Sequence, residues 1–217
     1  MRDALDRELA KARSGIAELC DIVLQESHTA LDALRRRSVE AAFAVREQDK
    51  TADIKRYQLE NTCLVALATQ QPVARDLREL LAASIIATEL ERCGDYAKGV
   101  ARATRRILKS VQDFSLFSLE EMERLATEML QHSVQAFLNS DAATARQVLA
   151  EDAKLDSLYS SMLSDVLSSM TRNVTPIEAG IWLLHAAHCL ERIGDRATNI
   201  AERTLFVTSG EPLADLN

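Results

Sequence analysis

The sequence predicts an all-α fold built from two tandem antiparallel three-helix bundles. Gly (6) and Pro (3) together supply 9 of 217 residues, whereas strand-rich and βαβ folds need many more turn residues. Apolar residues recur at helical spacing through most of the chain. A twelve-residue segment also occurs twice, once towards the end of each half, which indicates a tandem duplication.

The first half is expected to hold three helices within residues 1–112. The first helix is marked by apolar residues in a heptad rhythm, at Leu5, Leu9, Ala12, Ile16, Leu19 and Val23. The second is expected from about Ser38 to Gln70. Pro72 is predicted at the first position of the third helix, which continues to about Lys109.

The second half repeats this plan within residues 118–217, after a short connection without helical periodicity. Ser118 begins a capping-box pattern that opens the fourth helix. Asp141 is placed to cap the fifth helix. Pro176 is predicted at the first position of the sixth helix, and Gly210 is expected to end it.

The repeated segment shows how the two halves correspond. Leu90–Ala101 aligns without gaps on Leu190–Ala201, and 7 of the 12 positions are identical. Both segments fall in the third helix of their half. Gly94 and Gly194 lie on the apolar line of that helix, where the lack of a side chain predicts close helix–helix approach.

Charge and cysteine content exclude several classes of protein. A formal charge of −7 argues against affinity for nucleic acid through phosphate neutralisation. The cysteines show no C-x-x-C spacing, which excludes zinc-ribbon and thioredoxin-like motifs, and we expect each to be buried. The N-terminus lacks the apolar segment of a signal peptide, and the longest stretch without Asp, Glu, Lys or Arg is the 14 residues of 61–74. A cytoplasmic protein without membrane insertion is therefore expected.

Four pairs of acidic residues at i, i+4 spacing are the main candidates for a functional site. They are Asp49/Asp53, Glu91/Asp95, Asp152/Asp156 and Glu191/Asp195. Each pair costs a helix about 0.2–0.5 kcal/mol, so four pairs at matching places in a duplication indicate a compensating use. Carboxylates from neighbouring helices suit hard cations such as Mg²⁺, Mn²⁺, Ca²⁺ or oxidised iron. A solvated helix face is the alternative, since Arg92 and Arg192 each precede the second acid of a pair by three residues.

Two further groups of residues have alternative interpretations. His188 shares a helix face with Glu191, either as a metal ligand or as a partly exposed helix histidine. A basic cluster near the end of the third helix either complements the helix dipole or forms a surface for an anionic partner. Its members are Arg102, Arg105, Arg106 and Lys109. The sequence shows no motif that pairs a nucleophile with its base, so no enzyme is expected.

Two segments, Glu91–Asp95 and Leu190–Glu202, resemble the signature of the PhoU family of phosphate-signalling proteins. Glu47–Lys50 and Gln71–Arg78 support the resemblance, which covers essentially the whole chain in order and spacing. The resemblance implies two tandem three-helix bundles with paired acidic motifs. In that family, some members bind multinuclear iron or zinc clusters at these motifs, and others bind different ions.

Carried over to this sequence, the resemblance implies two metal sites. One would consist of Asp49, Asp53, Glu91 and Asp95. The other would consist of Asp152, Asp156, Glu191 and Asp195. Iron, zinc, manganese and magnesium are the candidate ions. The first site departs from the family pattern at Cys93, where Ile is usual, and at Gly99, where the second half keeps Asn199.

The resemblance further implies a regulatory adaptor of phosphate homeostasis. Such a protein restrains phosphate uptake and phosphate-starvation signalling by contacting the ATPase subunit of a phosphate ABC transporter and a sensor histidine kinase. Neither nucleic acid nor membrane is an expected partner, and a homodimer is an open alternative to a monomer. The competing hypothesis is a metalloenzyme that hydrolyses a phosphate ester with the same carboxylates. The sequence offers no evident general acid or substrate pocket, which favours the adaptor.

Overall fold

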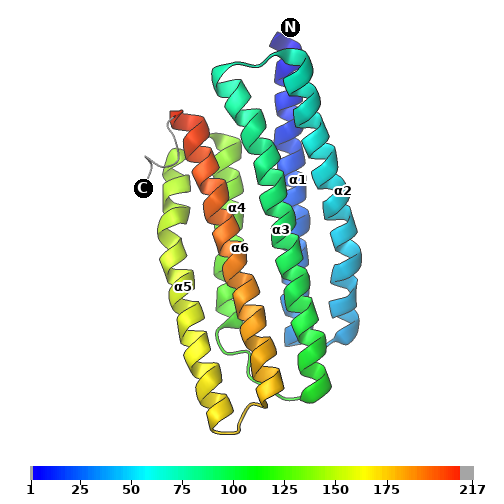
Figure 1. The fold of residues 1–217 in the computed structure, drawn as a ribbon, viewed down its shortest axis with the longest axis vertical. Coiled ribbons are helices and arrows are strands. Elements are labelled where there is room, and N and C mark those ends of the chain that lie inside the picture. Colours follow the sequence, from blue (N-terminus) through cyan, green and yellow to red (C-terminus); the bar gives the residue numbers. More distant parts are fainter. Residues whose placement is uncertain (1, 211–217) are drawn as a thin grey trace.

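Six long helices form the fold in the computed structural model, which describes residues 2–210 and, among these, all side chains except those of residues 46–49. The helices are α1 (Arg2–Arg35), α2 (Val39–Gln70), α3 (Ala74–Ser110), α4 (Leu119–Asn139), α5 (Ala142–Thr171) and α6 (Ile177–Ser209). All six follow one long axis (Figure 1). Residues 2–210 contain no strand, which confirms the all-α prediction.

The helices form two groups of three that lie side by side. Helices α1, α2 and α3 pack on one another, as do α4, α5 and α6. The two groups meet through α3 against α6, in the middle of Figure 1, and through α1 against α4. The boundaries of the two halves, 1–112 and 118–217, stay a prediction.

Several helix ends follow the capping chemistry that the sequence predicts. The Ser38 hydroxyl accepts a hydrogen bond of 3.1 Å from the Ala41 amide at the start of α2. Asp141 Oδ1 accepts hydrogen bonds of 2.9 Å from the Ala143 amide and 3.1 Å from the Thr144 amide, at the start of α5. Gly210 ends α6 in the left-handed conformation, with φ 77°. Ser118 stands at the N-cap of α4 as predicted, but its side chain makes no capping hydrogen bond.

Two predicted helix starts are wrong because of the local backbone. Gln71 is left-handed (φ 48°, ψ 53°), and Val73 is extended (φ −127°, ψ 159°). The turn therefore uses Pro72 as a linker residue, and α3 begins at Ala74. Pro176 has an extended ψ of 140°, so it is the N-cap of α6 and the helix begins one residue later.

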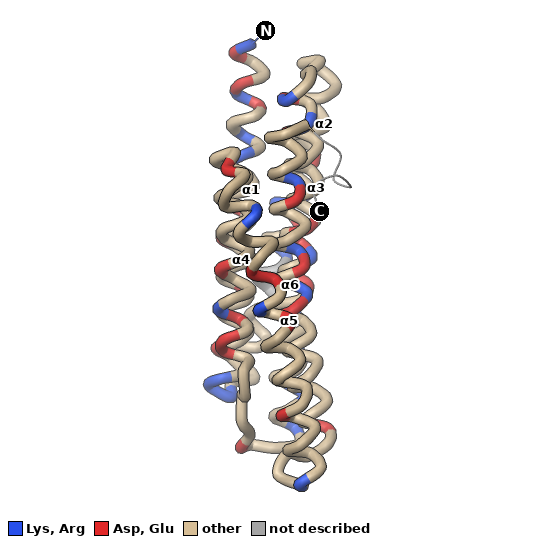
Figure 2. Tube along the Cα trace, turned by 90° about the vertical axis from the view of Figure 1, so that its left-hand side faces the viewer, with Lys and Arg blue, Asp and Glu red and all other residues tan. Residues whose placement is uncertain are grey.

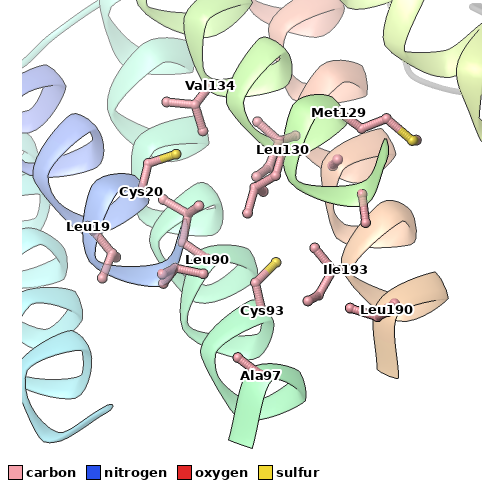
Figure 3. Close-up of a cluster of buried hydrophobic side chains, with 14 of the residues drawn as sticks. Leu19, Cys20, Leu90, Cys93, Ala97, Met129, Leu130, Val134, Leu190 and Ile193 are labelled. Atoms are coloured by element: carbon pink, nitrogen blue, oxygen red, sulfur yellow. The ribbon is translucent and has the colours of Figure 1, made fainter. Parts of the chain in front are cut away.

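One cluster of buried apolar side chains runs through both groups of helices. In Figure 3, Cys93 from α3, Leu130 from α4 and Ile193 from α6 lie between the two groups, and Leu19 from α1 and Leu90 from α3 lie on the side of the first group. All four cysteines are buried free thiols, which confirms the prediction for them. The core is therefore shared by the two groups.

Glycines mark the places where helices approach closely. A Cβ atom at Gly194 would overlap Cδ2 of Leu155, so α6 lies against α5 there, as predicted. A Cβ atom at Gly99 would lie 2.5 Å from Cys189 Sγ, at the contact between α3 and α6. This contact explains why the first half has Gly where the second half has Asn199.

Charged residues are distributed along the whole length of the helices (Figure 2). Within residues 2–210, no helix combines the length and apolar character that crossing a membrane requires.

Candidate metal centre

The second half places its two acidic pairs on α5 and α6, within electrostatic reach of each other. Asp152 and Asp156 lie one turn apart on α5, and Glu191 and Asp195 lie one turn apart on α6. The two helices pack against each other. The side chains of Glu191 and Asp195 are 13% and 26% exposed, so they flank the core and are not fully within it.

These carboxylates share one electrostatic environment. Burial raises the pKa of Glu191, and the nearby Asp195 and Asp156 carboxylates raise it further. Burial likewise raises the pKa of Asp152, with added contributions from Asp156 and Asp195. A carboxylate of each pair therefore raises the pKa of a carboxylate on the neighbouring helix. Such a group resists full ionisation unless positive charge is supplied.

Arg192 supplies part of that positive charge. Its Nη1 atom lies 2.7 Å from Asp195 Oδ2, and its Nε atom lies 3.0 Å from Glu191 Oε2. His188 Nδ1 lies 3.4 Å from the same Glu191 oxygen. The local ion pairs that the sequence offered as an alternative use of these acids are thus present. A metal ion would compete with Arg192 for the same oxygens.

The first half has a looser arrangement. Burial raises the pKa of Glu91 on α3, as do Asp95 and then Asp53 of α2, while Arg56 lowers it. Asp95 is 54% exposed, and its Oδ1 atom lies 2.6 Å from Lys98 Nζ. Asp49, the fourth predicted ligand, has a side chain outside the described residues.

The donor set fits a hard cation, but its side chains are not gathered around one point. Among the side chains that the structure describes, no three of His, Cys, Asp or Glu lie close enough together to hold a metal ion. Carboxylate oxygens from two packed helices are nevertheless the ligand type that Mg²⁺, Mn²⁺ or oxidised iron prefers. Mutual repulsion among the acids also favours an added cation. The metal sites stay a prediction.

A polar contact that was not predicted from the sequence joins the two groups of helices. The nearly buried Glu89 of α3 accepts hydrogen bonds through Oε2 from Arg196 Nη1 at 3.0 Å and from Asn199 Nδ2 at 3.1 Å, both on α6. The alignment of the two repeated segments could have indicated this contact, because Arg196 and Asn199 stand where the first half has Tyr96 and Gly99. A difference between two otherwise matched segments indicates a role specific to one of them.

Both halves of this arrangement match one protein family. Residues 16–104 and residues 119–204 each match the family model described as the PhoU domain. The chain belongs to the PhoU family. The predicted resemblance is therefore confirmed, and it covers helices of both groups.

Relatives from several bacteria match along nearly the whole length of this chain. The phosphate-specific transport system accessory protein PhoU homolog of Xylella fastidiosa (strain 9a5c) is 35% identical over 211 residues, which cover 96% of this chain and 88% of that protein. The protein of the same name from Caulobacter vibrioides (strain NA1000 / CB15N) is 34% identical over 208 residues, covering 95% and 90%.

Solved structures of the family have the same fold. The crystal structure of the phosphate transport system regulatory protein PhoU from Streptococcus pneumoniae matches with a TM-score of 0.88 at 28% identity, covering 95% of this chain and 98% of that chain. The crystal structure of PhoU from Pseudomonas aeruginosa matches with a TM-score of 0.89 at 29% identity, covering 95% and 99%.

Proposed function

We propose that the protein is a regulatory adaptor of phosphate homeostasis that restrains phosphate uptake and phosphate-starvation signalling. Its partners would be the ATPase subunit of a phosphate ABC transporter and a sensor histidine kinase, both met on the cytoplasmic side of the membrane. The match of both halves to the PhoU domain is the observation behind this proposal. Relatives named as accessory proteins of phosphate-specific transport support it.

An exposed apolar stripe on α3 supports a role in protein–protein contact. Leu77, Leu81 and Ile85 are 37–45% exposed, and their spacing of four places them on one helix face. Val73, directly before the helix, is 73% exposed. Neighbouring exposed apolar side chains of this kind are typical of protein interaction sites.

The proposal includes cation binding at the paired acids. In the second half, α5 would contribute Asp152 and Asp156, and α6 would contribute Glu191 and Asp195. In the first half the corresponding residues are Asp49, Asp53, Glu91 and Asp95. The pKa values of Glu91, Asp152 and Glu191 are raised, which means that their charged forms are disfavoured. A cation at either place would stabilise those charged forms. Arg192 would then be released from Asp195 and become available to a partner.

Gene deletion and complementation test the adaptor role. We expect deletion to raise expression of phosphate-starvation genes while phosphate is plentiful, and the parent gene to reverse this rise. The Leu77→Ser/Leu81→Ser variant should fail to reverse it, because the α3 stripe is lost. Leu163→Ser/Leu167→Ser is the matched control on α5, since these leucines are also exposed and four apart. Unchanged expression after deletion, in a strain without a second copy, would exclude the adaptor role.

An enzyme assay separates the adaptor from the metalloenzyme. We expect no turnover of phosphate esters by the purified chain with Mg²⁺, Mn²⁺, Zn²⁺ or iron. Hydrolysis at ordinary enzymatic rates, lost in Glu191→Ala/Asp195→Ala, would overturn the adaptor assignment.

A further inference from the structure

A basic groove lies between α2 and α3, next to the acidic pair Glu91/Asp95 of the first half, and Asp95 lines it. Its first hollow, of about 630 Å³, is lined by Lys50, Lys98, Arg102 and Arg105, with Phe43 beside them. A second hollow of about 350 Å³ shares Phe43, Arg102 and Arg105 with the first and continues past Arg106 and Lys109. We use "basic groove" for the cationic residues Lys50, Lys98, Arg102, Arg105, Arg106 and Lys109. The volumes fall in the range of small-molecule binding sites.

Among the described residues that line the groove, cationic side chains outnumber acidic ones. Asp95 is the sole acid among the described residues that line it, and Lys98 lies 2.6 Å from that carboxylate. The Arg105 guanidinium stacks 4.6 Å above the Phe43 ring. Its buried Nε atom has no hydrogen-bond partner among the described residues. This excess occurs in a chain whose formal charge is −7, so the groove is a local exception.

The helix dipole does not account for these charges. Only Lys109 stands in the last turn of α3, and the dipole's influence fades beyond that turn. The second half also has the same helix without them. The positions 100 residues after Lys98, Arg102, Arg105, Arg106 and Lys109 hold Thr198, Glu202, Leu205, Phe206 and Ser209. The fold therefore does not require a basic groove. This favours the other explanation of the basic cluster, which is binding of an anion.

We propose that the basic groove binds the polyphosphate chain of a small anion. Lys98, Arg102 and Lys109 mark a row that extends over about 16 Å of helix at the usual rise per residue. One orthophosphate reaches only neighbouring cations in such a row, whereas several linked phosphates reach more of them at once. Arginine and lysine are the side chains that bind phosphate oxygens through charge-assisted hydrogen bonds. A nucleoside triphosphate and inorganic tripolyphosphate share this chemistry.

Binding is tested on the full chain in EDTA, so that no metal ion bridges protein and phosphate. Isothermal titration calorimetry with tripolyphosphate, ATP and orthophosphate measures the three affinities. Fluorescence of Trp182, the single tryptophan, gives a second readout for tripolyphosphate, because Arg106 lies 5.6 Å from its ring. We expect one saturable site for tripolyphosphate and for ATP, weakening with added salt, and an affinity for orthophosphate at least about tenfold lower.

Paired variants distinguish the groove from general attraction of anions. Arg102→Gln/Lys109→Gln removes two exposed groove charges and should weaken tripolyphosphate binding at least about tenfold. Arg146→Gln/Lys154→Gln removes two exposed charges from α5 and should leave the affinity unchanged. Circular dichroism melts establish that both variants are folded.

Four results would overturn the proposal. These are no binding of tripolyphosphate, equal loss of affinity in the two paired variants, orthophosphate binding as tight as tripolyphosphate, and binding of ATP without binding of tripolyphosphate. The last result would mean that the nucleoside is recognised and that the row of cations is not. Each is independent of the adaptor role, since none of these measurements involves a partner protein.

Discussion

Glu191 illustrates how single side chains balance two uses of the acidic pairs. It is held between like charges from Asp195 and Asp156 and a compensating guanidinium from Arg192. The guanidinium contacts both acids of the α6 pair, at 3.0 Å and 2.7 Å. A bound cation would offer the same oxygens a higher charge density. The chain therefore has its own competitor for the metal, which predicts a weaker metal affinity than the same carboxylates would have without Arg192.

Metal-dependent stability is the first prediction at the scale of residues. We expect added Mn²⁺, Mg²⁺, Zn²⁺ or iron to raise the melting temperature and EDTA to lower it. A ligand at a hundred times its Kd stabilises by about 2.7 kcal/mol. Glu191→Ala/Asp195→Ala should remove most of this shift. Glu91→Ala/Asp95→Ala should remove less, because Asp95 is 54% exposed and already paired with Lys98.

The same thermal melts can contradict the prediction of metal binding at the acidic pairs. If both double variants keep the metal-dependent shift of the parent, the acidic pairs are solvated helix faces that Arg192 and Lys98 neutralise. In EDTA, Glu191→Ala/Asp195→Ala should be no less stable than the parent, since it removes mutual repulsion. A large loss of stability there would mean that the ion pairs with Arg192 are the purpose of the acids.

The raised pKa of Glu191 predicts the sign of a pH dependence. A folded-state pKa above the ordinary value of 4.5 means that the folded chain holds the proton more tightly than the unfolded chain. The resulting stabilisation is complete below that ordinary value and is lost as the pH rises through the raised pKa. Because glutamine does not titrate, the Glu191→Gln variant does not undergo this loss of stability. We therefore expect the variant to gain stability relative to the parent as the pH rises above the ordinary value of 4.5, in urea unfolding with EDTA.

Glu18 offers a control of opposite sign. The ion pair with Lys55 and a hydrogen bond from Ser14 lower the pKa of Glu18. Its stabilisation is present above its ordinary pKa and is lost as the pH falls through the lowered pKa. Glu18→Gln should thus lose stability relative to the parent as the pH rises. Shifts in the same direction for both variants would contradict the assignment for Glu191.

At the scale of elements, the sequence was sufficient where local chemistry decides the structure. Ser38, Asp141 and Gly210 cap helices through contacts within a few residues, so their roles were predictable. Pro72 was misplaced because the left-handed backbone at Gln71 is not evident from residue type, and the turn absorbs the next two residues.

The candidate site was likewise predictable from the sequence only in part. Helical periodicity was enough to place Glu191 and Asp195 beside the core, because both lie on one helix. The contact of Glu89 with Arg196 was not predictable, since it joins residues 107 apart in the sequence and depends on how α3 meets α6. The choice between Arg192 and a metal ion as the neutralising charge also depends on side-chain geometry that periodicity does not contain.

Close packing of α5 and α6 gives a prediction for Gly194. Gly194→Ala adds a Cβ atom that overlaps Leu155, which is almost fully buried and has little room to move. Overpacking of this kind costs about 1–3 kcal/mol, more than the ~1 kcal/mol gained from helix propensity. We expect a lower free energy of unfolding in urea and partial recovery in Gly194→Ala/Leu155→Val. Gly15→Ala is the control, since its nearest neighbour, Leu59 Cδ1, is 3.1 Å away and the net change should be small.

For the whole molecule, the contacts between the two groups of helices are both apolar and ionic. The shared apolar cluster is continuous from one group to the other (Figure 3). On one side Glu89 of α3 pairs with Arg196 of α6 at 3.0 Å. On the other side His28 of α1 lies 2.5 Å from Glu123 of α4. Separating the groups would expose the cluster and break both pairs, so the two groups should unfold together.

Cooperative unfolding is tested by destabilising one group of helices with a substitution and measuring the unfolding of the other group. Trp182 on α6 reports on the second group, whereas far-ultraviolet circular dichroism reports on all six helices. Leu59→Ala removes a buried side chain from α2, in the first group, at a cost of about 2–5 kcal/mol. If the core is one unit, the urea midpoint seen by Trp182 fluorescence must fall as far as the midpoint seen by circular dichroism. A Trp182 midpoint that stays at the parent value, while the dichroism signal splits into two transitions, would show that each three-helix group is stable alone.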